Sequence, residues 1–295
     1  MSRTASPSTE KIYGLVRVCK IWKMARSTVY WRKTHTPSLA RRGPRPWRSD
    51  SEILTAIRAF IVESEFFGEG YRKVHAALRF NGLRTSPRRV LRLMRENNLL
   101  APSRVGRAHG PKTHDGHIKT ERINDMWGTD MTTTLTIDDG TASIFFAIDH
   151  CSLEVVGLHA AKRATRFEAL EPIRQGLIDH FGALSEKAAE GLAIRHDHGS
   201  QFISSTYQKE LRFLGIKSSP SFVREPQGNG IAERFVRTLK ENLLWIRRFA
   251  TVEELRLALL KFKDAYNHKW MVGRHGYKTP AQVRAAQSFA LPKAA

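Results

Sequence analysis

The pattern of apolar residues changes near residue 125, and this change limits what the chain can fold into. Segments after this point that are short, apolar and rich in β-branched residues are expected to be strands: residues 127–137, 142–149, 154–160, 192–196 and 216–219. Helices are expected over residues 167–181 and 204–214, each closed by a glycine. Successive strands followed by alternating helices and strands predict a mixed α/β layer fold.

The positive charge of the chain is concentrated before this change. Residues 1–124 hold 26 Lys and Arg against 9 Asp and Glu, whereas residues 125–295 hold 23 against 19. A strongly basic region beside a nearly balanced one indicates a protein that binds a polyanion, and nucleic acid is the natural candidate. The alternative is a generic basic protein such as a ribosomal one, although such proteins rarely carry a balanced, strand-rich second half.

The remaining composition narrows the class of protein. Cys19 and Cys151 are the only cysteines, and their contexts predict buried thiols, which fits a reducing cytosol. His109, His114 and His117 cluster in a linker without a cysteine pair, so a zinc finger is not expected. No apolar run approaches the ~20 residues of a membrane span, and the N-terminus has no apolar signal region. We therefore expect a cytoplasmic protein without a membrane partner.

The basic half is expected to consist of short helices joined by linkers. Residues 11–33 have the cadence of a helix-turn-helix, and a small helical hairpin with no DNA role is the alternative. Residues 51–99 predict a further helical unit, in which Ser86-Pro87 caps and starts the third helix. Basic, proline-containing linkers are expected over residues 36–50 and 101–124.

The third helix of this unit carries a row of arginines. Its apolar residues are expected inside, which leaves the arginines available outside: Arg88, Arg89, Arg92 and Arg95. Such a row on a helix that follows a turn suits contact with phosphates and a DNA groove. A solvated basic face without a ligand is the alternative.

Three acidic residues of the second half stand in separate, recognisable contexts. Asp130 lies on the first predicted strand, Asp197 follows the fourth, and Glu233 opens a helical stretch. Open α/β sheets place ligands just beyond strand ends. Glu233 lies one residue off the apolar stripe of its helix, so its side chain is expected at the flank. The residues of that stripe are Ala232, Val236, Leu239, Leu243 and Ile246.

Three carboxylates brought together can hold hard divalent cations, which prefer oxygen ligands. A pair of such ions roughly 4 Å apart activates the attacking oxygen and stabilises the leaving one in phosphodiester chemistry. Arg237 and Lys240 share the helix face of Glu233 and are candidate contacts for the DNA backbone. The structural alternatives are a strand-end cap for Asp130, a turn residue for Asp197 and an ion pair between Glu233 and Arg237.

Other polar residues near these acids are expected to support the structure. His196 and His198 flank Asp197 but point away from it along a strand, so they are interpreted as residues behind the ligands or at the substrate's edge. Asp149 ends the second predicted strand, where structural hydrogen bonding is a more natural role than catalysis.

Three segments resemble the core of transposases of the retroviral-integrase type, with the 35-residue gap between Asp197 and Glu233 that this family uses. They are Trp127-Gly128-Thr129-Asp130-Met131-Thr132, His196-Asp197-His198-Gly199-Ser200-Gln201-Phe202 and Asn229-Gly230-Ile231-Ala232-Glu233-Arg234-Phe235. Upstream and downstream segments resemble the helix-turn-helix module and the closing segment of transposases of the third bacterial insertion-sequence family. They are Gly70-Tyr71-Arg72-Lys73-Val74 with Val90-Leu91-Arg92-Leu93-Met94, then Tyr266-Asn267 and Gly276-Tyr277-Lys278-Thr279-Pro280.

The resemblance implies an RNase H-like catalytic core, a five-stranded mixed sheet flanked by helices, after an all-α helix-turn-helix DNA-binding region. It implies a DDE active site in which Asp130, Asp197 and Glu233 hold two Mg²⁺ or Mn²⁺ ions, and it adds Arg72 and Lys73 to the candidate DNA contacts. The expected organisation is an N-terminal helical segment, a helix-turn-helix-like domain, a basic linker, the catalytic core and a helical extension, over residues 1–48, 49–100, 101–124, 125–250 and 251–295.

The resemblance also implies partners. These are the inverted-repeat ends of an insertion sequence, target DNA and further protomers in a synaptic complex. In this family the active transposase is often a frameshift fusion of such a second-frame product with an upstream helix-turn-helix and leucine-zipper protein, a segment that the chain is expected to lack. The family's usual arginine after the Tyr-Asn pair is replaced here near His268-Lys269-Trp270.

These observations predict a bacterial, nucleoid-associated DNA transposase subunit that cleaves 3′ ends and transfers strands. One alternative is a DNA-binding regulator of transposition without catalysis. The other is an RNase H-like nuclease that cleaves without joining.

Overall fold

The computed structural model describes residues 3–34, 47–102, 120–221 and 230–290. The chain forms two compact units, Met1–Ser49 and Asp50–Ala295. In the first unit, α1 (Leu15–Ile21) and α2 (Arg26–Thr34) confirm the predicted helical pair. Most of the two predicted linkers lies outside the described residues.

The second unit begins with a module of three helices. They are α3 (Asp50–Glu63), α4 (Tyr71–Phe80) and α5 (Pro87–Glu96). The apolar stripes of the three helices meet in a small core: Ile53, Ile57, Val74, Leu78, Val90, Leu93 and Met94. The Ser86 side chain accepts a hydrogen bond from the backbone N–H of Arg89 at 3.2 Å, which confirms it as the cap of the third helix.

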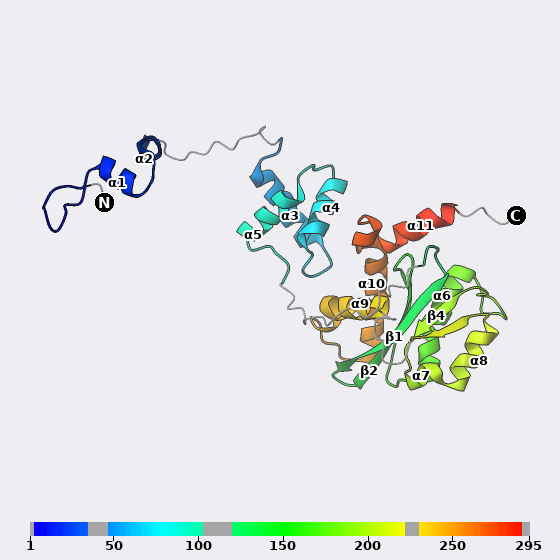
Figure 1. The fold of residues 1–295 in the computed structure, drawn as a ribbon. Helices are drawn as coiled ribbons and strands as arrows, with labels where there is room; N and C mark the ends of the chain where they lie inside the picture. The colour runs from blue at the N-terminus through cyan, green and yellow to red at the C-terminus, as the bar shows by residue number, and fades with distance from the viewer. Residues whose placement is uncertain (1–2, 35–46, 103–119, 222–229, 291–295) are drawn as a thin grey trace. The chain divides into compact units, whose positions relative to one another are not determined.

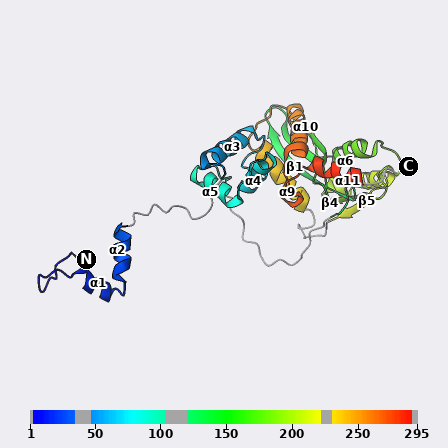
Figure 2. The same ribbon diagram turned by 90° about the horizontal axis from the view of Figure 1, so that it is seen from above.

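A five-stranded sheet follows, with strand order β3-β2-β1-β4-β5. The strands are β1 (Met126–Thr136), β2 (Gly140–Asp149), β3 (Val155–Ala161), β4 (Ala193–His196) and β5 (Lys217–Pro220). The first three form an antiparallel meander, whereas β4 and β5 run parallel to β1. Figures 1 and 2 show the sheet and its helices from two directions. The predicted mixed α/β core is confirmed.

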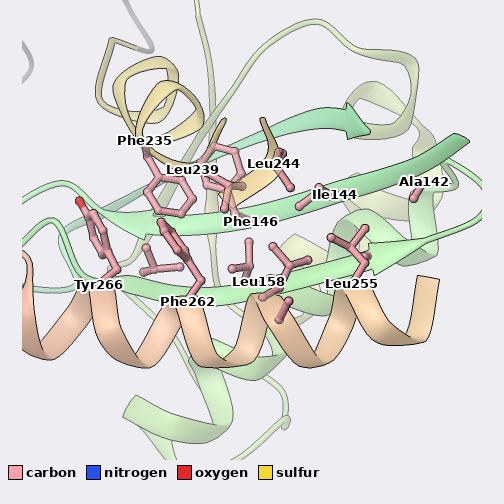
Figure 3. Close-up of a cluster of buried hydrophobic side chains, with 14 of the residues drawn as sticks. Ala142, Ile144, Phe146, Leu158, Phe235, Leu239, Leu244, Leu255, Phe262 and Tyr266 are labelled. Carbon is pink, nitrogen blue, oxygen red and sulfur yellow. The ribbon is translucent and has the colours of Figure 1, made fainter. Parts of the chain in front are cut away.

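Helices cover both faces of the sheet because its central strands are apolar on both sides. Phe145 of β2 packs among α6 (Arg166–Phe181), α7 (Ser200–Ile203) and α8 (Ser205–Phe213). Its neighbour Phe146 faces α9 (Gly230–Leu239) and α10 (Val252–Lys269). Successive side chains of a strand point to opposite faces, so one strand supplies both cores. Figure 3 shows the second core, where Phe235, Phe262 and Tyr266 gather beside Phe146.

One close contact fixes α6 against the sheet. A Cβ atom at Gly157 of β3 would lie 1.9 Å from the carbonyl oxygen of Pro172 in α6, so any larger residue forces the two elements apart. A Cβ atom at Gly176, one turn further along α6, would lie 2.8 Å from the Trp127 ring. The helix therefore rests on the sheet backbone itself.

The predicted stripe of the Glu233 helix is wrong at its end. Ile246 was placed in the core, but it is 53% exposed, and Leu244 is buried one position after the predicted Leu243, which is only partly buried. The cause is a turn of π-helix, Lys240–Leu244, which follows α9 directly. A π-turn holds one residue more than an α-turn, so it shifts the apolar face by one position.

The last elements of the described residues are a short 3₁₀ turn, Gly273–His275, and α11 (Pro280–Ala290). Thr279 and Gln282 exchange side-chain-to-backbone hydrogen bonds of 3.3 and 3.0 Å, which cap α11. Within the described ranges, no helix has the length and apolar character needed to cross a membrane.

Candidate active site

Asp130 and Asp197 start from neighbouring positions in the sheet. The parallel register of β1 and β4 pairs Gly128 with Arg195, and two residues further along each chain come Asp130 and Asp197. Adjacent strands lie about 4.8 Å apart, so the two backbones diverge little over this step. The prediction that one aspartate lies on the first strand and the other just past the fourth is confirmed.

Glu233 reaches the same region from the helix that crosses this face. Asp130 pairs with Phe146 across β1 and β2, and directly opposed residues of an antiparallel pair share a face. The Phe146 ring packs against Phe235 of α9, with ring centroids 4.8 Å apart. Glu233 lies in the first turn of α9 and is exposed, as its place off the apolar stripe predicts.

Asp130 is affected both by burial and by nearby charges. Burial raises the pKa of Asp130 to about 6, and the nearby charges of Asp197 and Glu233 push it in the same direction. A hydrogen bond of 2.7 Å from the Met131 backbone N–H and the charge of Lys240 act the opposite way. Partial burial also raises the pKa of Glu233. These charge effects on Asp130 agree with the strand register and the course of α9, which bring the three carboxylates to one region.

The grouped carboxylates do not form a ready-made ion cage. Among the described residues, no three acidic, His or Cys side chains are arranged to hold one metal ion. Both aspartates accept hydrogen bonds from backbone donors. Asp130 accepts from Met131, and Asp197 accepts from the Gly199 N–H at 2.9 Å.

The histidines beside Asp197 are held by the protein. His196 is buried, with Nδ1 2.7 Å from the Asp197 carbonyl oxygen and Nε2 2.9 Å from the Ser218 hydroxyl. Burial lowers its pKa. His198 Nε2 lies 2.7 Å from the Ser221 carbonyl oxygen, which ties the turn after β4 to the chain after β5. Both rings therefore support the Asp197 turn.

Lys240 is a cation whose charge acts on one of the acids. It lies in the π-turn after α9, and its charge reaches Asp130. Arg237, expected on the same face, points its Nε to Glu241 at 2.7 Å instead. The two candidates on this helix therefore differ, because Arg237 is paired with Glu241 whereas the charge of Lys240 acts on Asp130.

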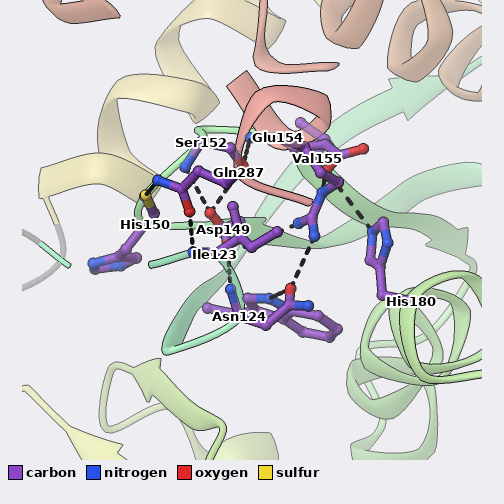
Figure 4. A network of polar contacts seen from close by, with 12 residues as sticks. Ile123, Asn124, Asp149, His150, Ser152, Glu154, Val155, His180 and Gln287 are labelled. Carbon is purple, nitrogen blue, oxygen red and sulfur yellow. Dashed lines mark hydrogen bonds and ion pairs between the residues drawn. The ribbon is translucent and has the colours of Figure 1, made fainter. Parts of the chain in front are cut away.

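Asp149 has the structural role that was expected of it. Its carboxylate is fully buried and accepts hydrogen bonds from the Asn124 N–H, the Ser152 N–H and the Ser152 hydroxyl at 2.8, 2.6 and 2.8 Å. Arg284 of α11 lies between Asp149 and Glu154, and Figure 4 shows the network that results. This network fastens the C-terminal helix to the sheet. Cys151 lies beside it as a buried free thiol, like Cys19, which confirms that prediction.

The candidate DNA contacts of the helical module fall into two groups. Arg88, Arg95 and Arg72 are exposed. Arg89 and Arg92 instead both bind Asp50 of α3, at 2.7 and 2.6 Å. This pairing also lowers the pKa of Asp50. Lys73 is mostly buried, with its Nζ 3.4 Å from Glu69 and 2.9 Å from the centre of the Trp270 ring.

Arg274 has a structural role that the sequence pattern does not predict. Its half-buried guanidinium donates hydrogen bonds to the carbonyl oxygens of His150 and Cys151, the latter at 2.6 Å. Burial lowers its pKa. The Tyr266-Asn267 pair has a structural role, because the Asn267 side chain exchanges hydrogen bonds of 2.9 and 3.0 Å with the Val155 backbone. An arginine in an irregular stretch after a helix has no periodicity that would single it out.

Two protein families match parts of the chain. The family described as "Integrase core domain" matches residues 214–280, which include Glu233 and α10. The family described as "HTH-like domain" matches residues 48–107, which include the three-helix module. A five-stranded mixed sheet with helices on both faces, in a chain with an integrase core domain, is the predicted RNase H-like fold, so the fold class is confirmed.

Curated relatives match most of the chain in sequence. Transposase InsD for insertion element IS2A/D/F/H/I/K of Escherichia coli is 26% identical over 244 residues, which cover 79% of this chain and 78% of the relative. The chain is a homologue of the insertion-element transposases. Transposase InsD for insertion element IS2-9 of Escherichia coli strain K12 matches this chain equally well, with 26% identity over 79% of this chain and 76% of the relative.

Solved structures similar to this chain include retroviral ones. A simian T-cell lymphotropic virus intasome in complex with the PP2A regulatory subunit B56 gamma aligns with a TM-score of 0.46 and 21% identity, over 75% of this chain and 72% of that one. The catalytic core domain of BIV integrase aligns with a TM-score of 0.40 and 22% identity, over 57% and 97%.

Proposed function

We propose that this chain catalyses metal-dependent DNA 3′-end cleavage and strand transfer during transposition, with Asp130, Asp197 and Glu233 as its catalytic carboxylates. The observation that supports the proposal is the grouping of these acids at paired strand ends and the first turn of α9, in a chain that matches the integrase core family; burial and, to a smaller extent, the charges of Asp197 and Glu233 raise the pKa of Asp130. Asp130 lies on β1, Asp197 follows the end of β4, which is parallel to β1, and Glu233 lies in the first turn of α9.

The donor set fits divalent metal ions. Three carboxylates offer the hard oxygen ligands that Mg²⁺ and Mn²⁺ prefer. Burial, and to a smaller extent the charges of Asp197 and Glu233, make the ionised form of Asp130 unfavourable, and a bound cation would favour that form. The residues that would hold two ions are Asp130, Asp197 and Glu233. Bound ions of this kind activate the attacking oxygen and stabilise the leaving oxygen.

Residues around the acids would bind and orient DNA. Lys240 lies where its charge reaches Asp130, so it is suited to hold a phosphate of the strand being cut. Arg237 is a weaker candidate for the same strand because Glu241 engages it. In the helical module, the exposed Arg72, Arg88 and Arg95 would contact phosphates directly. Arg89 and Arg92 would do so only with the part of their charge that Asp50 leaves free, and Lys73 would act by holding α4 in place.

The ligands of this machinery would be the inverted-repeat ends of an insertion element and a target DNA. A reaction that joins two ends to one target also calls for more than one protomer. The upstream helix-turn-helix and leucine-zipper protein would then be a fusion partner that contributes to end recognition.

A strand-transfer assay tests the proposed function. Purified protein, alone and fused to the upstream-frame protein, is incubated with labelled element ends and plasmid target in Mg²⁺, Mn²⁺ or EDTA. We expect joined product in either metal and none in EDTA. Cleaved ends that are never joined would indicate a nuclease, and tight binding without cleavage would indicate a regulator; either outcome contradicts the proposal.

DNA binding by the basic half is expected to weaken steeply with salt. Each phosphate neutralised by Lys or Arg releases a counterion, so a contact with six to ten phosphates lowers affinity by about 10³–10⁵ between 50 and 200 mM salt. Fluorescence anisotropy with a labelled duplex measures this slope. Arg88→Ala and Arg95→Ala should each reduce the slope by about one counterion. An affinity that changes less than about tenfold over the same range would contradict phosphate contact by this region.

A further inference from the structure

The loop between α3 and α4 is built into the catalytic core. Phe66 of this loop is only 7% exposed and belongs to the core cluster of β2, α9 and α10. Its ring lies edge-on to Trp270 and Phe262, with centroid distances of 4.9 and 6.3 Å. A residue of the helical module therefore completes the core against which the catalytic helix packs.

Asn242 joins the next residue of that loop to the catalytic helix. Its Oδ1 accepts a hydrogen bond of 2.7 Å from the Phe67 backbone N–H, and its Nδ2 donates one of 2.8 Å to the Thr238 carbonyl oxygen. The side chain is 7% exposed, so these polar atoms depend on the two partners instead of water. Asn242 thus binds the module with one end and α9 with the other.

The position of Asn242 in the helix is unusual. It lies in the π-turn that also contains Lys240 and that directly continues α9, the helix of Glu233. π-turns are rare and occur often at functional sites. Here the extra residue lets Leu244 enter the core while Asn242 meets the loop.

Charged contacts flank this joint. Lys73 of α4 lies over the Trp270 ring and pairs with Glu69, and Lys269 of α10 forms an ion pair with Glu65. Lys73 and Lys269 therefore connect the module and the core on either side of Phe66. Movement of α4 would therefore displace the end of α10 as well as Asn242.

We propose that Asn242 is a positioning residue that couples the helix-turn-helix module to the catalytic helix, so that DNA held by the module fixes Glu233 and Lys240 at the reacting strand. The inference rests on the proposed function, because it requires that the module binds DNA. It adds that the bound end of the element controls the activity of the carboxylate site through the Phe67–Asn242 contact.

The test compares two DNA substrates on the full chain in Mg²⁺. The long substrate carries the whole element end, and the short one keeps only the terminal base pairs around the cleavage site. At saturating DNA, wild-type protein should react faster with the long substrate in a single turnover. Asn242→Ala should remove this advantage by slowing the reaction of the long substrate about tenfold, which is the effect of losing one hydrogen bond. The affinity for the long substrate and the rate with the short substrate should not change.

Two variants serve as matched controls. Thr238→Ala lies on the same helix and loses only a hydroxyl that bonds to the Arg234 carbonyl oxygen, and it keeps the carbonyl that Asn242 uses. Phe67→Ala removes a 70% exposed ring but keeps the backbone N–H. Both should retain the wild-type ratio of rates. If Asn242→Ala unfolds, Lys269→Ala takes its place, because this exposed lysine can be removed without opening the core and should lower the same ratio by a smaller factor.

A second readout separates this inference from the proposed function. Hydrogen exchange of residues 230–244 is measured with and without a long duplex. DNA should slow exchange in wild-type protein and leave it unchanged in Asn242→Ala, whether or not strands are joined. The coupling is wrong if Asn242→Ala keeps the wild-type rate ratio and exchange response, or if it slows both substrates equally. Failure of strand transfer alone, with the exchange response intact, would instead overturn the proposed chemistry.

Discussion

Asp130→Asn, Asp197→Asn and Glu233→Gln are each expected to lower strand transfer by on the order of a thousandfold or more, which corresponds to roughly 4 kcal/mol of activation free energy. Each change removes one negative charge from the group that would hold the ions, and a divalent cation loses a hard ligand and its charge balance together. The assay is product formation at saturating DNA in Mg²⁺.

The substitutions are close to isosteric, so folding and DNA affinity should survive. The Asn oxygen at position 130 can still accept from the Met131 N–H, and that at position 197 can still accept from the Gly199 N–H. Asp138→Asn is the matched control, because Asp138 is an exposed acid in the turn after β1. It should transfer strands at the wild-type rate. Wild-type turnover by any of the three active-site variants, with metal still required, would remove that residue from the catalytic set.

Much of the catalytic core could be predicted because its signals are local. The β-branched runs end within one or two residues of the observed strands, and the Gly182 and Ser204 signals end and start helices as expected. The positions of Asp130 and Asp197 follow from the strands that carry them. Neighbouring strands with parallel register then bring the two acids together, which a sequence pattern alone does not specify.

The errors come from contacts between distant residues. The π-turn after α9 exists because Leu244 enters the core and Asn242 meets Phe67, far away in the chain, so a regular helical stripe wrongly buried Ile246. Arg89 and Arg92 look like surface arginines until α3 brings Asp50 beside them. Helical periodicity predicts which face is apolar, but it carries no information on the ion pairs made across a helical bundle.

The stability of the metal-free protein is expected to fall as the pH rises from about 4 to about 6, in part because of Asp130. Its pKa is raised from 3.8 to about 6 in the folded state, so the folded protein binds more protons than the unfolded chain between these values. Full ionisation therefore costs about 3 kcal/mol of unfolding free energy, at 1.36 kcal/mol per pKa unit. The penalty is absent below pH 4 and complete above pH 6.

Asp130→Asn isolates this penalty because asparagine does not ionise. Urea unfolding in EDTA at several pH values should show the variant gaining stability over wild type as the pH rises, and the gain should level off above pH 6. Excess Mg²⁺ or Mn²⁺ should then stabilise wild type but not the variant, by about 2.7 kcal/mol at a hundred times the dissociation constant. A stability difference that does not change with pH would mean that Asp130 ionises freely. In that case neither burial nor the neighbouring carboxylates would disfavour the ionised form of Asp130, and a metal ion would have no such penalty to relieve.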